Sequence, residues 1–339
     1  MRTAQLDQII RQRDPELRRA VESLAKGETA DAVRRLSEQR RVHEISDAEQ
    51  RLKAVAGEYL KDPDKSLVVS PVNQSRIELN RYIHERLQAQ GEVRSNGHRA
   101  IVLVNRPELT GADRQWAASY ELGDAIRYSR GSGSVGVKAG DYATVVRVEK
   151  RENLLTVRRK NGQESTYDPK RLQGVNVYRK EEQEFSIGDR VQFTAPFNRA
   201  RIANRELGRI EKIDPDGDLL LRLESGRSVR FNLQEHPHLD YGYAMTSYTS
   251  QGQTVDRVIV HIPAKDLNNS ELVNQRFAYV AVSRARIDAQ IYTNDATELS
   301  SRLGKDVSKA AAVQARDLRQ AGRLAAKEAV HKGQELAQV

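Results

Sequence analysis

Apolar residues in the first 60 positions recur at the spacing of helices that bury one face. Asp14 and Pro15 are typical of a helix start, and Gly27 is typical of a helix end. The apolar positions between them are Leu17, Ala20, Val21 and Leu24. A second short helix is predicted next, and its buried face contains Ala32, Val33 and Leu36. Asp47 and Gln50 have capping-box spacing, and the helix after them has an apolar face of Leu52, Val55, Ala56 and Tyr59. The pattern predicts a helical start.

The next segment alternates between strand and helix. Residues 66–70, SLVVS, have the composition of a short buried strand, and Pro71 and Asn73 predict a turn after it. Residues 74–91 have helical spacing, and AIVLV at 100–104 has the composition of another strand. This alternation predicts a parallel sheet covered by helices.

The pattern changes to short alternating segments with tight turns between about residues 130 and 235. Asn161-Gly162 is a hairpin signal, and the pairs Gly140-Asp141 and Gly188-Asp189 open two similar blocks. These features predict two small β-barrels side by side. Strand–helix–strand spacing returns after residue 240, so the β block interrupts one α/β domain.

Composition narrows the class of protein. The 339 residues include 56 Lys and Arg against 47 Asp and Glu, a formal net charge of +9. That excess suits a phosphate backbone, although a merely basic soluble protein has the same charge. The absence of cysteine excludes disulfides and thiolate catalysis. We expect a cytoplasmic protein without membrane insertion, because the chain has no run of about 18 apolar residues and no signal peptide.

Candidate chemistry lies in two segments that flank the strand at 257–262. The first, YAMTSYTSQGQTVDRVIVHI, contains Thr246 and a turn at Ser250-Gln251-Gly252. Such a turn at a strand end is able to bind phosphate or sugar oxygens, but an SQG turn taken alone is more often an ordinary turn. The second segment, YVAVSRAR at 279–286, contains Arg284 and Arg286.

Together these segments resemble motifs V and VI of superfamily 1 helicases. The resemblance implies that Arg284 is an arginine finger for the γ-phosphate of ATP. The segment LDQIIRQRDPELRRAVESLAKG resembles motif IV, which implies the same role for Arg11; a solvated helix charge is the alternative. Gln12 and the turn residues Ser250, Gln251 and Gly252 are then expected to be nucleotide-binding.

The resemblance also implies single-stranded DNA contacts. LVVSPVNQSRIELN resembles the family segment whose loop meets the DNA backbone, with Ser70 and Asn73 as phosphate donors or as plain turn residues. Thr246 and Tyr248 complete the expected DNA-binding set. Tyr248 either stacks on a base or belongs to the core.

A narrower resemblance, over about residues 1–300, is to the TraI/TrwC conjugative relaxase–helicases and their RecD-like relatives. It implies an α/β fold: a RecA-like second motor domain with two inserted SH3-like barrels, a helical N-terminal segment and a C-terminal helix. The expected boundaries are 1–62 for the helical start with motif IV and 63–128 for the first RecA-like part. The barrel pair follows at 129–236, the remaining RecA-like part with motifs V and VI at 237–300, and a basic tail, helical or disordered, at 301–339.

The chain departs from the family pattern because it has no G-x-x-x-x-G-K-[ST] P-loop and no acidic pair for Mg²⁺. We therefore expect a motor half that meets ATP and Mg²⁺ only in an intact motor and binds neither alone, so enzymatic activity stays open. Expected partners are single-stranded DNA, a P-loop motor domain, and conjugative secretion or coupling proteins. The alternatives are a non-catalytic module that binds DNA or a secretion partner, and an inactive remnant. His236 and His238 lack partners at metal spacing, and we expect no metal site.

Overall fold

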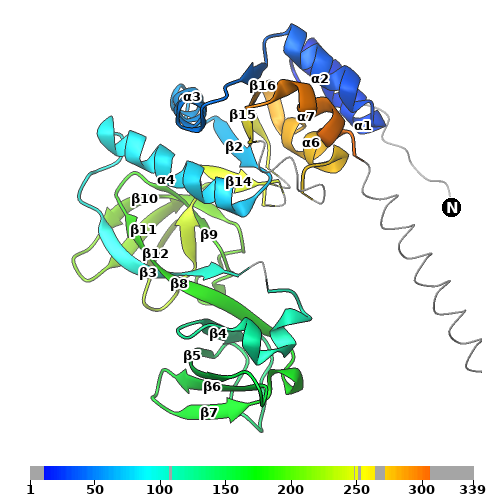
Figure 1. The fold of residues 1–339 in the computed structure, drawn as a ribbon. Helices are drawn as coiled ribbons and strands as arrows, with labels where there is room; N and C mark the ends of the chain where they lie inside the picture. Colours follow the sequence, from blue (N-terminus) through cyan, green and yellow to red (C-terminus); the bar gives the residue numbers. More distant parts are fainter. Residues whose placement is uncertain (1–10, 107–108, 248, 251–252, 264–271, 306–339) are drawn as a thin grey trace, which may run out of the picture. The chain divides into compact units, whose positions relative to one another are not determined.

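The structure, a computed structural model, describes residues 11–106, 109–247, 249–250, 253–263 and 272–305. The chain divides into two compact units (Figure 1). Unit 1 combines Met1–Arg86 with Tyr243–Val339, and unit 2 is the continuous stretch Leu87–Gly242. One unit is therefore built from two distant stretches of sequence, and the other is inserted between them.

Unit 1 contains a five-stranded sheet in the order β1-β16-β15-β2-β14. Every neighbouring pair of strands is parallel. The strands are β1 (Val42–Glu44), β2 (Ser66–Ser70), β14 (Ala244–Thr246), β15 (Val255–Ile262) and β16 (Ala285–Thr293). All five residues of β2 are buried, as expected for a parallel strand covered on both faces.

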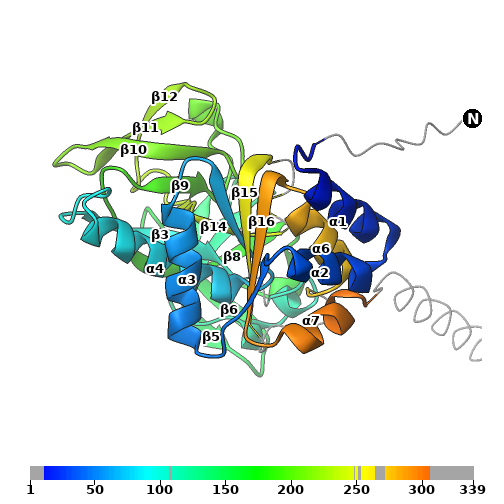
Figure 2. The same ribbon diagram turned by 90° about the horizontal axis from the view of Figure 1, so that it is seen from above.

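Helices cover both faces of this sheet. The helices are α1 (Pro15–Lys26), α2 (Thr29–Glu38), α3 (Ala48–Leu60), α4 (Asn73–Ala89), α6 (Gln275–Val282) and α7 (Ala296–Leu303). Figure 2 shows α3 on one side of β15 and β16, and α1, α2, α6 and α7 on the other. The predicted caps are confirmed: Asp14 accepts from the Leu17 amide, Asp47 accepts from the Gln50 amide, and Gly27 adopts a left-handed conformation with φ 83°.

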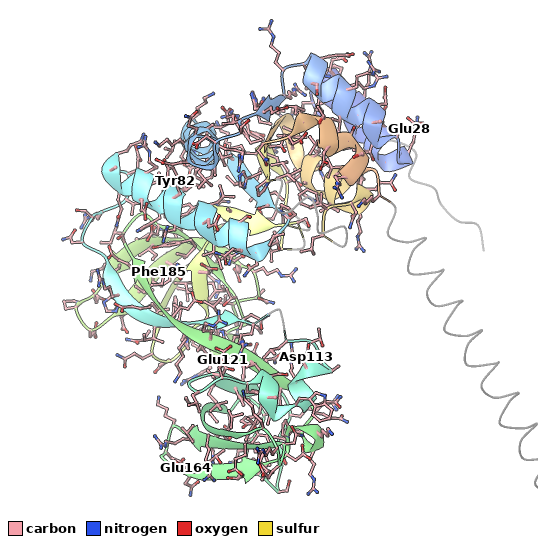
Figure 3. All side chains as sticks on the ribbon, in the orientation of Figure 1. Glu28, Tyr82, Asp113, Glu121, Glu164 and Phe185 are labelled. Carbon is pink, nitrogen blue, oxygen red and sulfur yellow. The ribbon has the colours of Figure 1, made fainter. Side chains whose placement is uncertain are left out.

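Unit 2 consists of two antiparallel sheets with a few 3-10 turns. The six-stranded sheet has the order β3-β8-β4-β5-β6-β7 and contains β3 (His98–Asn105), β4 (Ala125–Tyr128), β5 (Tyr142–Glu149), β6 (Leu154–Arg159), β7 (Glu164–Tyr167) and β8 (Val175–Phe185). The five-stranded sheet has the order β12-β11-β10-β9-β13 and contains β9 (Arg190–Phe193), β10 (Leu207–Ile213), β11 (Asp218–Leu223), β12 (Ser228–Asn232) and β13 (Leu239–Tyr241). The 3-10 turns are η1 (Asp113–Gln115), η2 (Ala117–Ser119), η3 (Pro169–Arg171) and η4 (Asn198–Ala200). Figure 3 labels Phe185, which is fully buried at the end of β8.

The two Gly-Asp pairs occupy equivalent turns in the two sheets. Gly140 and Gly188 both have positive φ, 92° and 100°. Asp141 accepts a hydrogen bond from the amide of the residue three positions before it, and Asp189 does the same. A strand begins directly after each aspartate, which explains why the sequence of the two blocks looks repeated.

Two of our expectations need correction. The strand at 100–104 is part of β3, which pairs antiparallel with β8 in unit 2 and does not join the parallel sheet. Its half-exposed pattern, with Ile101 54% exposed, suits a sheet with one solvated face. The second correction is β1, a short strand in a region for which we predicted helices only; three residues are too few to produce a visible alternation.

The predicted tail at 301–339 lies almost entirely outside the described residues, which end at 305. Among the described helices, none has the length and apolar character needed to cross a bilayer.

Candidate functional site

Arg284 lies where α6 ends and β16 begins. It is buried, with 9% of its surface exposed, and its Nε donates to the Val280 carbonyl oxygen at 3.1 Å. Among the described residues no carboxylate pairs with it. Burial lowers the pKa of Arg284, and the nearby charge of Arg11 lowers it further. The structure therefore brings together the two arginines that the motifs singled out.

The backbone around Arg284 is held by the segment that contains Arg11. Arg11 Nη1 donates to the Ser283 carbonyl oxygen at 2.9 Å. Gln12 Nε2 donates to the carbonyl oxygens of Ser283 at 3.1 Å and Ala285 at 2.8 Å, one on each side of Arg284. The amide of Gln12 thus fixes the loop that presents the arginine.

Gln12, for which we expect a contact with the nucleotide, packs against the backbone around Arg284. Its side chain is completely buried, and its Oε1 has no hydrogen-bond partner among the described residues. Its amide nitrogen contacts the backbone on both sides of Arg284.

Arg286, two residues further on, has a different environment. Its Nε and Nη2 donate to Asp256 Oδ1 at 2.8 and 2.6 Å. The carboxylate neutralises Arg286, whereas Arg284 and Arg11 carry charge without such a partner in the described part of the chain. The two arginines of the SRAR segment are therefore not equivalent.

The residues expected to contact DNA lie near the carboxyl ends of two neighbouring strands. Ser70 and Thr246 end β2 and β14 and face each other in the parallel register. Thr246 and Thr249 exchange hydrogen bonds that close a tight turn. Asn73 begins α4, where its Oδ1 accepts from Arg76 Nε at 2.8 Å. Ser70 is fully buried with no hydrogen-bond partner for its Oγ among the described residues, so its hydroxyl does not face solvent.

The Ser250 turn is a structured connection between β14 and β15. Ser250 is fully buried, its Oγ donates to the Ser247 carbonyl oxygen at 2.9 Å, and its amide donates to the Thr246 carbonyl oxygen at 2.9 Å. Tyr248, Gln251 and Gly252 lie outside the described residues. The part of the turn that the structure describes has its polar groups satisfied internally.

The two groups of candidate residues lie at opposite edges of the same sheet. The Val255 amide, at the start of β15, donates to the Arg284 carbonyl oxygen, so the arginine pair lies at the amino edge. Ser70 and Thr246 lie at the carboxyl edge. At about 3.3 Å per residue, the eight residues of β15 separate these edges by roughly 25 Å.

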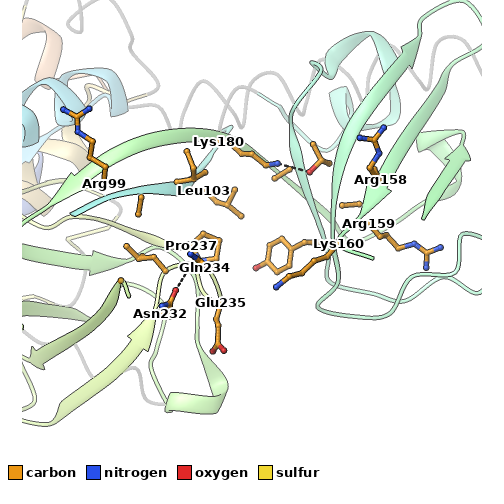
Figure 4. Close-up of a pocket in the computed structure, with 18 of the residues that line it drawn as sticks. Arg99, Leu103, Arg158, Arg159, Lys160, Lys180, Asn232, Gln234, Glu235 and Pro237 are labelled. Carbon is orange, nitrogen blue, oxygen red and sulfur yellow. Dashed lines mark hydrogen bonds between the residues drawn. The ribbon is translucent and has the colours of Figure 1, made fainter. Parts of the chain in front are cut away.

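Unit 2 contains a cavity of about 850 Å³ that our reading of the sequence did not predict (Figure 4). Its walls carry Arg99, Arg158, Arg159, Lys160 and Lys180, and one acidic residue, Glu235. Some of these cations are engaged: Arg158 pairs with Glu164 at 2.8 Å, and Lys180 Nζ donates to Thr144 Oγ1 at 2.9 Å. The sequence signal was the run Arg158-Arg159-Lys160 beside the Asn161-Gly162 turn.

Two histidines lie buried next to this cavity. His238 is fully buried and its Nε2 shares a hydrogen bond of 2.6 Å with the Tyr142 hydroxyl; His236 is 6% exposed. Burial lowers the pKa of His236 to about 4 and that of His238 to about 3. Within the described residues, no group of three or more His, Cys, Asp or Glu side chains has metal-binding geometry.

Comparison with known proteins agrees with the motifs. The AAA domain family matches residues 1–47. The multifunctional conjugation protein TraI of Escherichia coli is 22% identical over 253 residues, which are 74% of this chain and 14% of TraI. The conjugal transfer protein TraA of Agrobacterium fabrum is 30% identical over 113 residues, 33% of this chain and 10% of TraA.

Similar solved structures are those of Pif1 helicases. One, from a study of DNA unwinding at forked dsDNA by two coordinating Pif1 helicases, has a TM-score of 0.44 and 13% identity, and covers 92% of this chain and 54% of that chain. The Pif1 helicase from Candida albicans has a TM-score of 0.42 and 14% identity, with 88% and 58% covered.

The motifs resemble those of superfamily 1 helicases, and the sequence relationships are to conjugation proteins. More narrowly, the chain is a relative of the conjugation protein TraI, which confirms the resemblance seen in its motifs. The chain spans 14% of the length of TraI.

Proposed function

We propose that this chain is the second motor domain of an ATP-dependent, single-stranded DNA helicase of plasmid conjugation. In this proposal Arg11 and Arg284 bind the γ-phosphate of an ATP molecule held by a separate P-loop domain. The observation that carries the proposal is the arginine pair at the amino edge of the sheet, because neither guanidinium has a carboxylate partner among the described residues.

A phosphate suits such a pair. Two nearby cations repel each other, and Arg284 has in addition lost part of its hydration through burial. A multiply charged oxyanion between them would compensate both charges through charge-assisted hydrogen bonds. Groups placed in this way stabilise the charge that develops in phosphoryl transfer, and an arginine finger contributes about 10³–10⁵ in rate.

In this proposal a separate domain supplies the P-loop and the Mg²⁺ ligands. The sequence has no P-loop and no acidic pair for Mg²⁺, so the chain alone should not hydrolyse ATP. The residues proposed for DNA are Asn73, Thr246 and Tyr248, with Ser70 acting through its backbone since its hydroxyl is buried. The two antiparallel sheets of unit 2 are proposed to be SH3-like barrels, and the protein is proposed to act in the cytoplasm.

Trans-complementation tests this function. A P-loop motor domain of a TraI-type helicase is mixed with this chain, and ATP hydrolysis is measured with and without single-stranded DNA. We expect a gain in turnover that falls at least 100-fold with Arg284→Ala and persists with Arg286→Ala, whose side chain is already neutralised by Asp256. No gain, or equal gain with both variants, would refute the proposal.

A second candidate is a binding module without catalysis, favoured by the cationic cavity of unit 2. Its ligand would be single-stranded DNA or a partner of the conjugative secretion machinery. Lys160→Glu tests it, because this lysine lines the cavity and makes no ion pair with a described residue. Loss of binding in this variant, with no complementation of ATPase activity by the wild type, would favour the module over the motor.

A further inference from the structure

Arg51 lies on the buried face of α3, where the sequence pattern predicts apolar residues only. It is 5% exposed and precedes Val55 and Tyr59 at intervals of four residues on that face. No carboxylate forms an ion pair with it among the described residues. Burial lowers the pKa of Arg51, and the charge of Asp47 opposes this effect only in part.

Three hydrogen bonds fix the orientation of this guanidinium. Nη1 donates to the carbonyl oxygens of Ile45 at 2.7 Å and Ser46 at 3.2 Å, and Nε donates to His261 Nε2 at 3.3 Å. His261, near the end of β15, is 2% exposed. The remaining nitrogen, Nη2, makes no hydrogen bond with a described residue. A buried cation is thus held rigidly with one side of its donor fork unused.

A cavity of about 220 Å³ lies against Arg51. Its walls include Ser46, Ala48, Glu78, His261 and Asn294. These residues follow, or lie close to, the carboxyl ends of β1, β15 and β16, the edge at which open α/β sheets bind ligands. Ala48 is also the first residue of the 13-residue helix α3, whose N-terminus is capped by the Asp47 carboxylate, so Arg51 and not the helix end is the candidate donor at this cavity.

We infer that this cavity binds inorganic phosphate or the phosphate group of a small phosphate monoester, with Arg51 Nη2 as its cationic donor. The cavity is smaller than the 300–1,000 Å³ typical of pockets for drug-sized ligands, which matches a single oxyanion with its water. Bound phosphate would supply the counter-charge that Arg51 lacks.

Glu78 in the same wall predicts selectivity. A carboxylate only accepts hydrogen bonds, so it favours an oxyanion that still carries a proton and repels one that does not. Hydrogenphosphate has such a proton at neutral pH, whereas sulfate has none. The cavity should therefore prefer phosphate to sulfate.

This cavity is separate from the arginine pair. Arg11 and Arg284 lie at the amino edge of the sheet, and the cavity lies at its carboxyl edge, roughly 25 Å away along β15. One phosphate group cannot reach both, so the inference does not depend on the proposed helicase function.

Titration of the complete chain with sodium phosphate tests the inference, by calorimetry and by the amide NMR signals of α3. We expect saturable binding with shifts centred on residues 48–52. Arg51→Met should weaken it at least tenfold, since a charge-assisted hydrogen bond contributes about that much. Ala48→Glu should have the same effect, because it adds negative charge at the cavity without touching the hydrogen bonds of Arg51.

A matched control locates the site. Arg81→Met removes an arginine that is 78% exposed on α4, and this variant should bind phosphate as the wild type does. If Arg51→Met does not fold, Ala48→Glu decides. Absence of saturable binding, wild-type affinity in Ala48→Glu, loss of binding in Arg81→Met, or equal affinity for sulfate would each overturn the inference.

Discussion

Replacement of Gln12 by leucine tests how the arginine loop is held. The change keeps the volume of the side chain but removes the two hydrogen bonds to the Ser283 and Ala285 carbonyl oxygens. Ser283 keeps the donor from Arg11, while Ala285 loses its side-chain donor. Two lost bonds and one carbonyl with an unmet acceptor cost about 3–4 kcal/mol, and removal of the unpartnered Oε1 offsets about 1 kcal/mol.

The net loss of about 2–3 kcal/mol should lower the melting temperature of unit 1 by about 5–10 °C. Differential scanning calorimetry measures it, with Gln50→Leu as control, since Gln50 is exposed on α3. Well below the melting temperature, Gln12→Leu should also reduce complementation of ATPase activity, because Arg284 is no longer held in place. A melting temperature within 1 °C of the wild type would refute the reasoning about the clamp. Unchanged complementation would refute the positioning role.

The remaining predictions concern unit 2. His236 and His238 have pKa values lowered by burial, so the unfolded chain binds protons below pH 6.5 that the folded chain does not. The free energy of unfolding should be constant above pH 6.5 and fall as the pH decreases from there towards 4, by about 2 kcal/mol per histidine at pH 5. Urea unfolding at several pH values measures this change. His238→Gln should make the free energy of unfolding depend less on pH. The Arg106–Asp124 ion pair is buried, with 2.6 Å between Nη1 and Oδ2. Asp124→Asn should lower the free energy of unfolding by about 3–5 kcal/mol. Glu121→Gln, which changes an exposed carboxylate, should lower it by less than about 1 kcal/mol. Chemical denaturation that finds similar losses for both variants would contradict the argument from burial.

Much of unit 1 could be predicted because its signals are local. Asp14, Asp47 and Gly27 cap helices through contacts within three or four residues, and β2 is a short apolar run. The partner of a strand is a different matter. β3 has a composition that suits either sheet, and its pairing with β8 was decided by residues about 80 positions away.

In the candidate site, too, local motifs could be predicted from the sequence and contacts between distant residues could not. The sequence motifs identified Arg11 and Arg284 as a pair, and the structure brings them together. The burial of Gln12 could not be predicted, because it depends on a loop about 270 residues further along the chain. Arg51 did leave a signal, a charge at a buried helical position, but such a residue is usually explained by a long side chain that reaches solvent.

The insertion of unit 2 also has a consequence for the order in which the protein is made. β2 is a fully buried strand, yet both of its neighbours, β14 and β15, leave the ribosome more than 170 residues later. At about 5–20 residues per second that interval is about 10–35 s. Unit 2, a continuous stretch, is complete first and can fold while β2 still waits. During synthesis the apolar residues Leu67, Val68 and Val69 therefore stay without their sheet neighbours for that time, and we expect this segment to bind a chaperone.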